Sequence, residues 1–498
     1  MSMNACWELA PPDAAAMIEA LRGVGYSLPT AVADLLDNSI AVNAKNIWID
    51  FHWEGRGSWI RIADDGDGMT ETELFNAMRL GALNPLDVRT DSDLGRFGMG
   101  LKTASFSQCR RLTVASTKIS KLAVRRWDLD YIAKQKDWHL LTSCAPNSHM
   151  ILEPSLSTNG TVVLWELLDR IPGPYASNSK QGENAFLESI DRVERHLSMV
   201  FHRYLEGPVP NLTIHINGSA IRPWDPFLSS HAATTPRGSE PIPTDSGLVQ
   251  VKGFILPHKD RLKPSEWEAG GGLEGWTAQQ GFYVYRNRRM LVAGSWLGLG
   301  TGRAWTKEEA HKLARLQLDI QNTADAEWKI DIKKSTAKPP SELRPRLRAL
   351  AEDVRSEARK VFAHRGKYGA SQADPTIKRA WKSVTAGGSV KYQIDRQHPV
   401  VKEVLALAGN NTGMIETMLR VIEETVPVQK IWLDTVEQGE VQQGSFEGTP
   451  SNEVKKLLSI LYHDMCTRIG LGAKQAKAQL AQTEPFNRFP SLVQGLPE

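Results

Sequence analysis

Three short segments in the first hundred residues carry side chains suited to chemistry on a nucleotide. Residues 34–39 read Asp-Leu-Leu-Asp-Asn-Ser and lie in a stretch whose apolar spacing predicts a helix capped by Thr30. Asp34 and Asn38 are four residues apart, which places them on one helix face about one turn from each other. A carboxylate and an amide beside an apolar stripe indicate a polar ligand, although a solvated helix face has the same spacing.

The second segment, residues 64–69, reads Asp-Asp-Gly-Asp-Gly-Met and follows a predicted hairpin of strands 46–51 and 58–63. Asp64 at the strand end can accept a hydrogen bond from an exocyclic amine. Gly66 and Gly68 permit positive φ and a close approach of the backbone to a ligand. An Asp-Gly turn or a metal loop is the alternative, but the calcium-loop spacing is not met because no Glu stands at the twelfth position.

The third segment, residues 95–102, reads Gly-Arg-Phe-Gly-Met-Gly-Leu-Lys and leads into a predicted helix. Free N–H groups and the helix dipole at such a junction favour phosphate. The segment is no Walker A loop, because Leu101 separates the last glycine from Lys102, and its glycine order does not fit a dinucleotide fingerprint. Only the order and spacing of all three segments together predict a nucleotide pocket. The polar stretch 81–93 suits a lid over it.

Further elements must hold these segments in place. The first domain, 1–228, is expected to add strands at 111–116, 122–128, 160–165 and 212–218 and helices at 13–22, 71–80 and 184–204. A second domain, 229–365, is expected to begin with a linker or long loop at 229–247. It should then contain strands at 249–256, 281–285, 316–320 and 328–332, a short helix at 307–315 and a long charged helix at 341–363. We expect a linker at 366–397 and a helical domain at 398–498, with helices at 399–408, 412–424 and 451–469.

Composition limits the class of protein. A chain of 498 residues suits about three domains, and 41% hydrophobic with 23% charged residues is typical of a soluble globular protein. The net charge of +3 does not require nucleic acid, although basic clusters at 286–289 and 329–338 could line a nucleic-acid channel or be solvated. Four cysteines without paired spacing fit a reducing cytoplasm. Neither a signal peptide nor a membrane-spanning run is evident, which predicts a cytoplasmic protein.

The three segments together resemble the ATP-binding signature of the GHKL superfamily, which comprises gyrase-type topoisomerases, Hsp90 chaperones, sensor histidine kinases and MutL proteins. The sequences of residues 33–39 and 95–102 look closest to those of MORC-like ATPases and their bacterial relatives. The resemblance covers roughly residues 15–225. It implies an α+β protein with an N-terminal Bergerat-type α/β sandwich, a ribosomal-S5-like transducer domain and a small helical C-terminal domain.

The resemblance also implies ATP and Mg²⁺ as cofactors and a role for each residue. Asn38 would coordinate Mg²⁺, Asp64 would bind the adenine amine with Met69 against the base, and Thr161 would support Asp64. The phosphates would be held by Gly95, Gly98, Gly100 and Lys102. The other residues expected to bind the nucleotide are Gly66, Gly68, Phe97, Met99 and Leu101. In the transducer, Lys334 would sense the γ-phosphate, with Lys338 as the alternative.

One departure from the family concerns catalysis. The general base of the family is usually Glu, four residues before the metal-binding Asn, and here that residue is Asp34. Its carboxylate is one methylene shorter, so reaching the attacking water needs a helix shift or a second water, and we expect slow hydrolysis. Asp37 is a possible helper. Ala41 stands where many relatives carry Asp.

The resemblance implies an ATP-gated switch that closes as a homodimer. Its target could be DNA, and bacterial relatives suggest restriction or antiviral defence with a nuclease or helicase bound through the C-terminal domain. The alternative is a chaperone-like scaffold that binds protein partners without nucleic acid. A sensor kinase is disfavoured because no phospho-acceptor His helix precedes the nucleotide segments. A topoisomerase is disfavoured because no cleavage domain with an Asp-x-Asp metal cluster follows residues 15–225.

Overall fold

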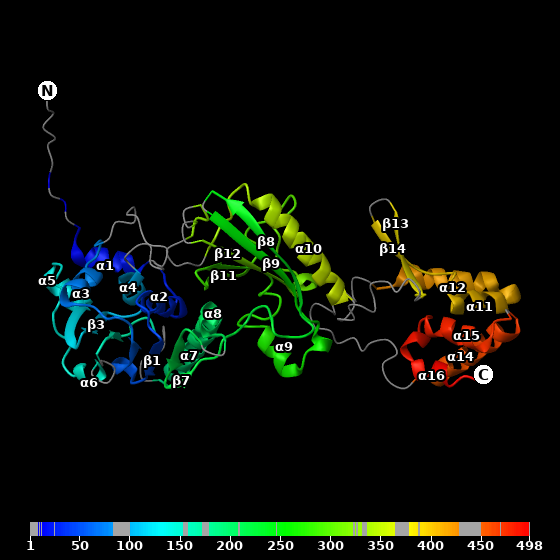
Figure 1. Ribbon diagram of the computed structural model, residues 1–498, viewed down its shortest axis with the longest axis horizontal. Coiled ribbons are helices and arrows are strands. Elements are labelled where there is room, and N and C mark those ends of the chain that lie inside the picture. Colours follow the sequence, from blue (N-terminus) through cyan, green and yellow to red (C-terminus); the bar gives the residue numbers. More distant parts are fainter. Residues whose placement is uncertain are drawn as a thin grey trace, which may run out of the picture. The chain divides into compact units, whose positions relative to one another are not determined.

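The computed structural model describes residues 8, 10, 12–23, 25–82, 100–152, 158–171, 179–207, 210–245, 247–321, 324, 327–330, 336–363, 378–386, 389–427, 450–468 and 470–497. The chain forms two compact units, Met1–Gly366 and Lys367–Glu498 (Figure 1). The mixture of sheets and helices confirms the expected α+β class.

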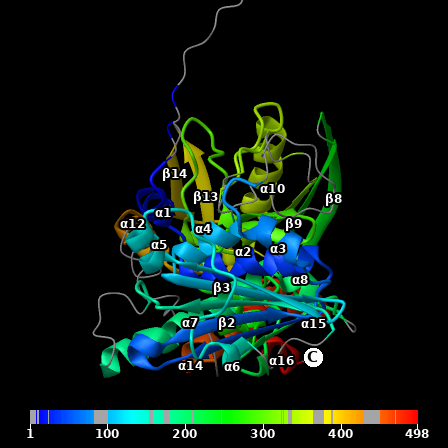
Figure 2. The same cartoon turned by 90° about the vertical axis from the view of Figure 1, so that its left-hand side faces the viewer.

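The first unit begins with a seven-stranded sheet in the order β4-β3-β5-β2-β1-β6-β7. Its strands are β1 (Asn46–His52), β2 (Trp59–Asp64), β3 (Arg111–Lys118), β4 (Lys121–Asp128), β5 (Gly160–Glu166), β6 (Thr213–Ile216) and β7 (Ser219–Ala220). The helices are α1 (Ala14–Arg22), α2 (Leu28–Ala41), α3 (Glu71–Met78), α4 (Gly100–Phe106), α5 (Leu129–Gln135), α6 (His149–Leu152), α7 (Lys180–Val200) and α8 (His202–Leu205). Figure 2 shows α2, α3 and α4 along one face of the sheet and α6 on the other, and side chains of β5 are buried on both faces.

A second sheet, of five strands, follows in the same unit in the order β11-β10-β12-β9-β8. Its strands are β8 (Thr235–Thr244), β9 (Gly247–Ile255), β10 (Gly281–Arg286), β11 (Arg289–Ser295) and β12 (Ala314–Ile320). Helix α9 (Pro264–Gly270) lies between β9 and β10 in sequence, and the long helix α10 (Arg344–Ala363) packs on β9 and β12. Strands β10 and β12 run parallel, and the other pairs are antiparallel.

Three expectations for this second sheet were wrong. The stretch expected as a linker, 229–247, contains strand β8, which the sequence hides because its prolines suit only a sheet edge. Residues 307–315 form only a short 3₁₀ turn, Glu309–His311, before the buried strand β12. Trp328 lies in a turn instead of a strand, and its carbonyl accepts a 2.7 Å hydrogen bond from the N–H of Lys338.

The second unit contains a hairpin and five helices among its described residues. The hairpin, β13 (Trp381–Ala386) and β14 (Ser389–Ile394), lies where a linker at 366–397 was expected. The helices are α11 (Pro399–Leu407), α12 (Thr412–Thr425), α14 (Asn452–Thr467), α15 (Ala473–Ala481) and α16 (Pro490–Gln494). The buried core of this unit comes mainly from α14, α15 and the residues around α16. None of the described helices in either unit has the length and apolarity that crossing a membrane requires.

Candidate nucleotide site

Helix α2 supplies the first group of site residues. Ser27, and not Thr30, is its N-cap: the Ser27 hydroxyl accepts a 3.4 Å hydrogen bond from the N–H of Thr30. Both Asp34 and Asp37 are buried, with exposed fractions of 5% and 1%, while Asn38 is exposed. Buried carboxylates need hydrogen bonds or charge partners, so the surroundings of these two residues define what the helix can do.

Asp34, the expected general base, is held by a tyrosine that the sequence reasoning missed. The hydroxyl of the buried Tyr26 donates to Asp34 Oδ2 at 2.8 Å, and the Tyr26 carbonyl accepts a 3.1 Å hydrogen bond from Gln108 Nε2. A Cβ at Gly100 would lie 3.7 Å from the same Asp34 oxygen. The structure therefore brings the first segment against the start of α4, in the third segment.

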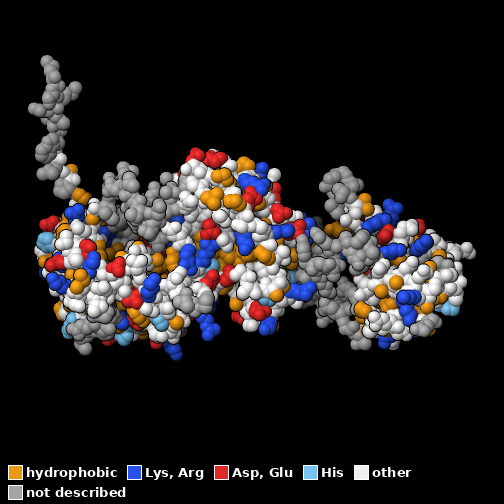
Figure 3. All heavy atoms as spheres, in the orientation of Figure 1, with side chains coloured by type: hydrophobic (Ala, Val, Ile, Leu, Met, Phe, Trp, Pro, Cys, Tyr) orange, Lys and Arg blue, Asp and Glu red, His pale blue; other side chains and the backbone are white. Residues whose placement is uncertain are grey.

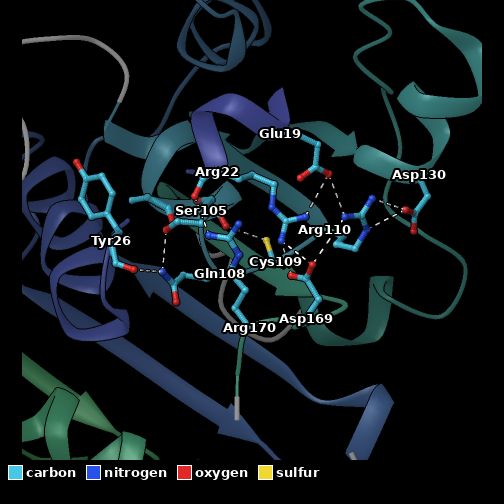
Figure 4. Close-up of polar contacts among 12 residues, drawn as sticks. Glu19, Arg22, Tyr26, Ser105, Gln108, Cys109, Arg110, Asp130, Asp169 and Arg170 are labelled. Carbon is cyan, nitrogen blue, oxygen red and sulfur yellow. Dashed lines mark hydrogen bonds and ion pairs between the residues drawn. The ribbon is translucent and has the colours of Figure 1, made fainter. Parts of the chain in front are cut away.

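A network of ion pairs frames this corner of the site (Figure 4). The buried guanidinium of Arg22, at the end of α1, donates to both carboxylate oxygens of Asp169 at 2.5 and 2.6 Å. Arg110 pairs with Asp130 and Glu19 on either side. Burial raises the pKa of the nearby Cys109 thiol, so this cysteine stays protonated and unreactive. The network fixes α1 and the chain leading to Tyr26.

Asp64, the expected adenine acceptor, is fixed by two donors. Ser39 Oγ donates to Asp64 Oδ2 at 2.8 Å, and the N–H of Gly66 donates to Oδ1 at 3.0 Å. Thr161 stands directly opposite Asp64 in the β2–β5 pairing. Burial raises the pKa of Asp64, and the hydrogen bonds from Gly66 and Ser39 oppose that shift. The result is a rigid acceptor at the end of β2.

Ser116 joins the second segment to β5 and was missed from the sequence. Its hydroxyl lies 2.9 Å from Thr161 Oγ1, donates to the carbonyl of Gly160 at 3.1 Å, and accepts from the N–H of Met69 at 2.8 Å. The side chain of Met69 is half-buried against the core. Neither Ser39 nor Ser116 could be found from spacing, because a lone serine in a helix or strand carries no distinguishing pattern.

Gly68 is needed for a reason other than the expected approach to a ligand. It has φ +68°, and a Cβ there would lie 1.9 Å from the carbonyl oxygen of Thr117. At Gly66 a Cβ would lie 2.8 Å from the carbonyl oxygen of Val42. The acidic turn is therefore packed against the protein's own backbone, which holds Asp64 in place.

Lys102 does not lie where a phosphate-binding lysine was expected. Its side chain is 1% exposed, and Nζ donates to the carbonyls of Ala77 at 2.8 Å and Arg79 at 3.1 Å, at the end of α3. Burial lowers the pKa of Lys102 to about 8. Leu101 packs against the core beside it. The remaining expected residues lie outside the described ones: Gly95, Phe97, Gly98, Met99 and Lys334.

The basic cluster 286–289 is exposed only in its middle, at Asn287 and Arg288. Arg286 and Arg289 are buried, with exposed fractions of 3% and 4%. Arg289 pairs with Asp37 at 3.1 Å, and Arg288 donates to the carbonyl of Arg203. The cluster sits in the β10–β11 turn, where it joins the second sheet to the first domain. Sequence could not reveal this, because a buried and a solvated arginine look alike.

Two other features lie near this junction. A cavity of about 320 Å³ has Thr30, Arg289 and Lys307 in its wall, and none of the expected nucleotide residues lines it. Among the described residues, one group has metal-ligand geometry: His202, Glu206 and Asp225, with ligand atoms within 4.8 Å of one another. Protein groups already contact these atoms. His202 contacts Glu206 and the Tyr285 hydroxyl, and the Asp225 carboxylate accepts from the N–H groups of residues 227 and 229.

Comparison with known proteins finds similarity in this part of the chain. Residues 26–161 match the family model described as histidine kinase-, DNA gyrase B- and HSP90-like ATPase, a span that begins at Tyr26 and ends at Thr161. The protein described as ATPase morc-1 from Caenorhabditis elegans is 30% identical over 89 residues, which cover 18% of this chain and 10% of that protein. The chain thus aligns with about a tenth of that relative. The N-terminal part of this chain is therefore similar to the GHKL-superfamily ATPases and to the MORC ATPases among them.

Proposed function

We propose that this protein binds ATP with Mg²⁺ and hydrolyses the nucleotide slowly. The observation that supports it best is the fixed Asp64 carboxylate, which Ser39 and the Gly66 N–H hold at the end of β2 within the family's matched span. A preorganised acceptor selects a base that carries an exocyclic amine, because a base without that donor leaves a buried carboxylate short of a partner. Adenine meets this requirement.

At the other end of the nucleotide, α2 supplies the chemistry. Asn38 is exposed on the helix and would hold Mg²⁺, which neutralises phosphate charge when bound. Asp34 lies one turn earlier, next to Gly100 at the start of α4, and acts as the general base. The Tyr26 hydroxyl bonds to the carboxylate that must accept the proton, and the side chain is one methylene shorter than the usual Glu. Both features make hydrolysis slow.

Nucleotide titration and turnover on the full chain test this function. We expect ATP to bind at least about tenfold more tightly than GTP, since a mispaired buried carboxylate costs on the order of 1–3 kcal/mol. Turnover should lie at or below the low end of the usual range of about 1–10³ s⁻¹. Equal affinity for ATP and GTP would contradict the role of Asp64. Fast turnover that survives Asp34→Ala would contradict the role of Asp34.

The wider action proposed is a dimeric clamp that ATP closes, with Lys334 or Lys338 sensing the γ-phosphate. Nucleotide would favour the closed state by binding it more tightly than the open one. Asp34→Asn should trap ATP, so sedimentation of this variant should show a dimer with ATP and a monomer without it. A monomer under both conditions, at a concentration well above the dissociation constant for ATP, would count against the clamp.

DNA as the target of the clamp, and a defence role with a nuclease or helicase, rest on the family resemblance. Of the arginines proposed to contact DNA, Arg289 is buried and pairs with Asp37, whereas Arg288 is exposed. Figure 3 shows basic side chains interspersed with acidic ones on the visible face of the described residues. DNA binding would have to weaken steeply with salt to support that target.

A protein-binding scaffold is the second candidate, and one observation favours it. Helix α12 in the second unit exposes an apolar row at helical spacing: Met414 (73%), Met418 (54%) and Val421 (55%). Exposed methionines on a helix face suit a protein partner, since large apolar patches are uncommon on soluble surfaces without one. A pull-down with the full chain and with Met418→Glu separates the candidates: loss of a bound protein in the variant supports the scaffold.

A further inference from the structure

A buried ion pair joins the second sheet to the helix that carries the proposed chemistry. Arg289 Nε lies 3.1 Å from Asp37 Oδ1, and the two side chains are 5% and 1% exposed. Arg289 also donates to the carbonyl of Met290, and its guanidinium carbon lies 5.3 Å from the centre of the Phe201 ring. Breaking such a pair leaves a charge buried without its partner, so the contact fixes the two backbones relative to each other.

The place of Asp37 on α2 gives this contact its meaning. Asp37 immediately precedes Asn38, the proposed magnesium ligand, and follows Asp34 by about one helical turn. Ser39, which holds Asp64, comes two residues after Asp37. These residues share one continuous, hydrogen-bonded helix. A shift of Asp37 along or around the helix axis therefore shifts Asp34 and Asn38, whereas Ser39 is held separately by its own bond to Asp64.

The place of Arg289 gives the other half of the connection. Arg289 begins β11, the edge strand of the second sheet, and stands opposite Arg286 in the β10–β11 pairing. Strand β10 in turn runs parallel to the central strand β12. A displacement of the second sheet is thus carried along paired strands to Arg289, and from there to Asp37.

Other contacts across the same junction come from α8. Arg203 pairs with Asp319 in β12, His202 Nε2 lies 2.8 Å from the Tyr285 hydroxyl, and the Tyr204 hydroxyl donates to the carbonyl of residue 287. Helix α8 carries none of the proposed nucleotide residues. These contacts hold the second sheet in place, whereas the Asp37–Arg289 pair reaches the nucleotide site itself.

We propose that Arg289 is a positioning residue for the nucleotide site. Acting through Asp37, it sets where α2 presents Asn38 and Asp34, and so it couples the second sheet to hydrolysis. This inference rests on the proposed ATPase function of the same site. Coupling between two sites is reciprocal. If the position of β11 affects how nucleotide binds against α2, bound nucleotide must favour that position of β11 by the same coupling free energy.

Kinetics of variants in the full chain test the proposal. Arg289→Met and Asp37→Asn should each lower kcat for Mg²⁺-ATP by about ten- to a hundredfold, the cost of misplacing groups at a reacting centre. Affinity for Mg²⁺-free ADP should stay within about threefold of the wild type, because Asp64 holds the adenine. The double variant should fall no further than the worse single variant, since neighbouring residues that share one contact are not additive.

Asp319→Asn is the matched control. It breaks the Arg203–Asp319 pair across the same junction without touching α2. Because this pair holds none of the proposed nucleotide residues, we expect kcat to stay within about threefold of the wild type. An equal loss of kcat in Asp319→Asn and Arg289→Met would show that the Asp37–Arg289 pair only stabilises the junction, and it would overturn the proposal. Additive single losses in the double variant would overturn it as well.

Hydrogen exchange distinguishes a positioning role of Arg289 from a merely structural one, because only positioning links exchange in β11 to bound nucleotide. A non-hydrolysable Mg²⁺-ATP analogue should alter amide exchange in β11 of the wild type, and this response should disappear in Arg289→Met. If that variant fails to fold, Arg289→Lys, which keeps the charge, should show a reduced response and an intermediate kcat; wild-type values there would refute positioning. If the wild type neither binds ADP nor hydrolyses ATP, the proposed function itself fails. A normal wild type with unaffected variants contradicts the positioning role alone.

Discussion

The two ends of the proposed nucleotide site are built differently. At the adenine end, Asp64 has one donor on each oxygen, and Thr161 and Ser116 tie its strand to the neighbouring strands. At the phosphate end, Asp34 is bonded to Tyr26, and Lys102 donates to the last carbonyls of α3. The adenine end is already organised for a ligand, whereas the phosphate end keeps its charged groups on protein partners. Binding and hydrolysis should therefore respond to different substitutions.

Asp34→Asn should produce the largest effect and sharpen the comparison most. General-base catalysis contributes about 10²–10⁴-fold, so steady-state hydrolysis should fall by that factor. The equilibrium dissociation constant for ATP should change by less than about threefold, because the adenine contacts are intact. Single-turnover kinetics alongside direct ATP titration separate the two quantities. A parallel loss of binding would show that Asp34 belongs to the binding end as well.

Lys102→Met tests whether the buried lysine contributes to the stability of the fold. The pKa of Lys102 is lowered to about 8 in the folded chain from 10.5. Between these pH values the unfolded chain binds more protons than the folded one, so the free energy of unfolding rises as the pH increases through this window. Between pH 7.5 and pH 10 we expect the free energy of unfolding of the wild type to rise by on the order of 1–3 kcal/mol. Urea denaturation at the two pH values measures this rise, which should be absent in Lys102→Met.

Lys118→Met is the control for that experiment, because Lys118 is partly exposed and pairs with Glu73 on the surface. It should retain the rise of the wild type. A wild-type chain whose stability does not rise over this pH range would mean that Lys102 is not buried at the end of α3.

Ser39→Ala should weaken the adenine end without touching the chemistry. It removes the 2.8 Å hydrogen bond to a buried carboxylate, and bonds to charged groups contribute about 1.5–3 kcal/mol. We expect ATP affinity to fall by about ten- to a hundredfold, while hydrolysis at saturating ATP stays within about threefold of the wild type. Ser189→Ala, a buried serine of α7 bonded to a backbone carbonyl, is a fair control for the loss of a hydroxyl. A loss of hydrolysis at saturating ATP in Ser39→Ala would contradict the claim that the adenine end and the phosphate end of the site act separately.

Tyr26→Phe should give the smallest change, which concerns kcat and the phosphate end of the site. Removal of the hydroxyl leaves Asp34 without the donor seen at 2.8 Å but keeps the ring in the core. A net hydrogen bond of about 0.5–1.5 kcal/mol predicts a two- to about tenfold rise in kcat with ATP affinity unchanged, because the released carboxylate accepts the proton more readily. Tyr204→Phe, at the domain junction, controls for the loss of a phenol. An affinity change in Tyr26→Phe larger than its kcat change would contradict the placement of Tyr26.

The sequence predicted the parts of the site that depend on spacing. Asp34 and Asn38 share a helix, Asp64 ends a strand, and Gly100 begins a helix, because periodicity and glycine turns follow from local chain geometry. It could not predict partners that only tertiary folding supplies. The bond from Tyr26, the link through Ser39 and the Asp37–Arg289 pair join positions up to 252 residues apart. The edge strand β8 was missed because its prolines are typical of a linker.

The account rests on Asp64 binding the adenine while Asp34 acts on the phosphates. ATP titration of the full chain with Asp64→Asn beside Asp34→Asn tests this most directly. The account predicts that Asp64→Asn loses ATP binding by about a hundredfold, as expected for a mispaired buried group, whereas Asp34→Asn binds like the wild type. ATP binding by Asp64→Asn at wild-type strength would contradict it.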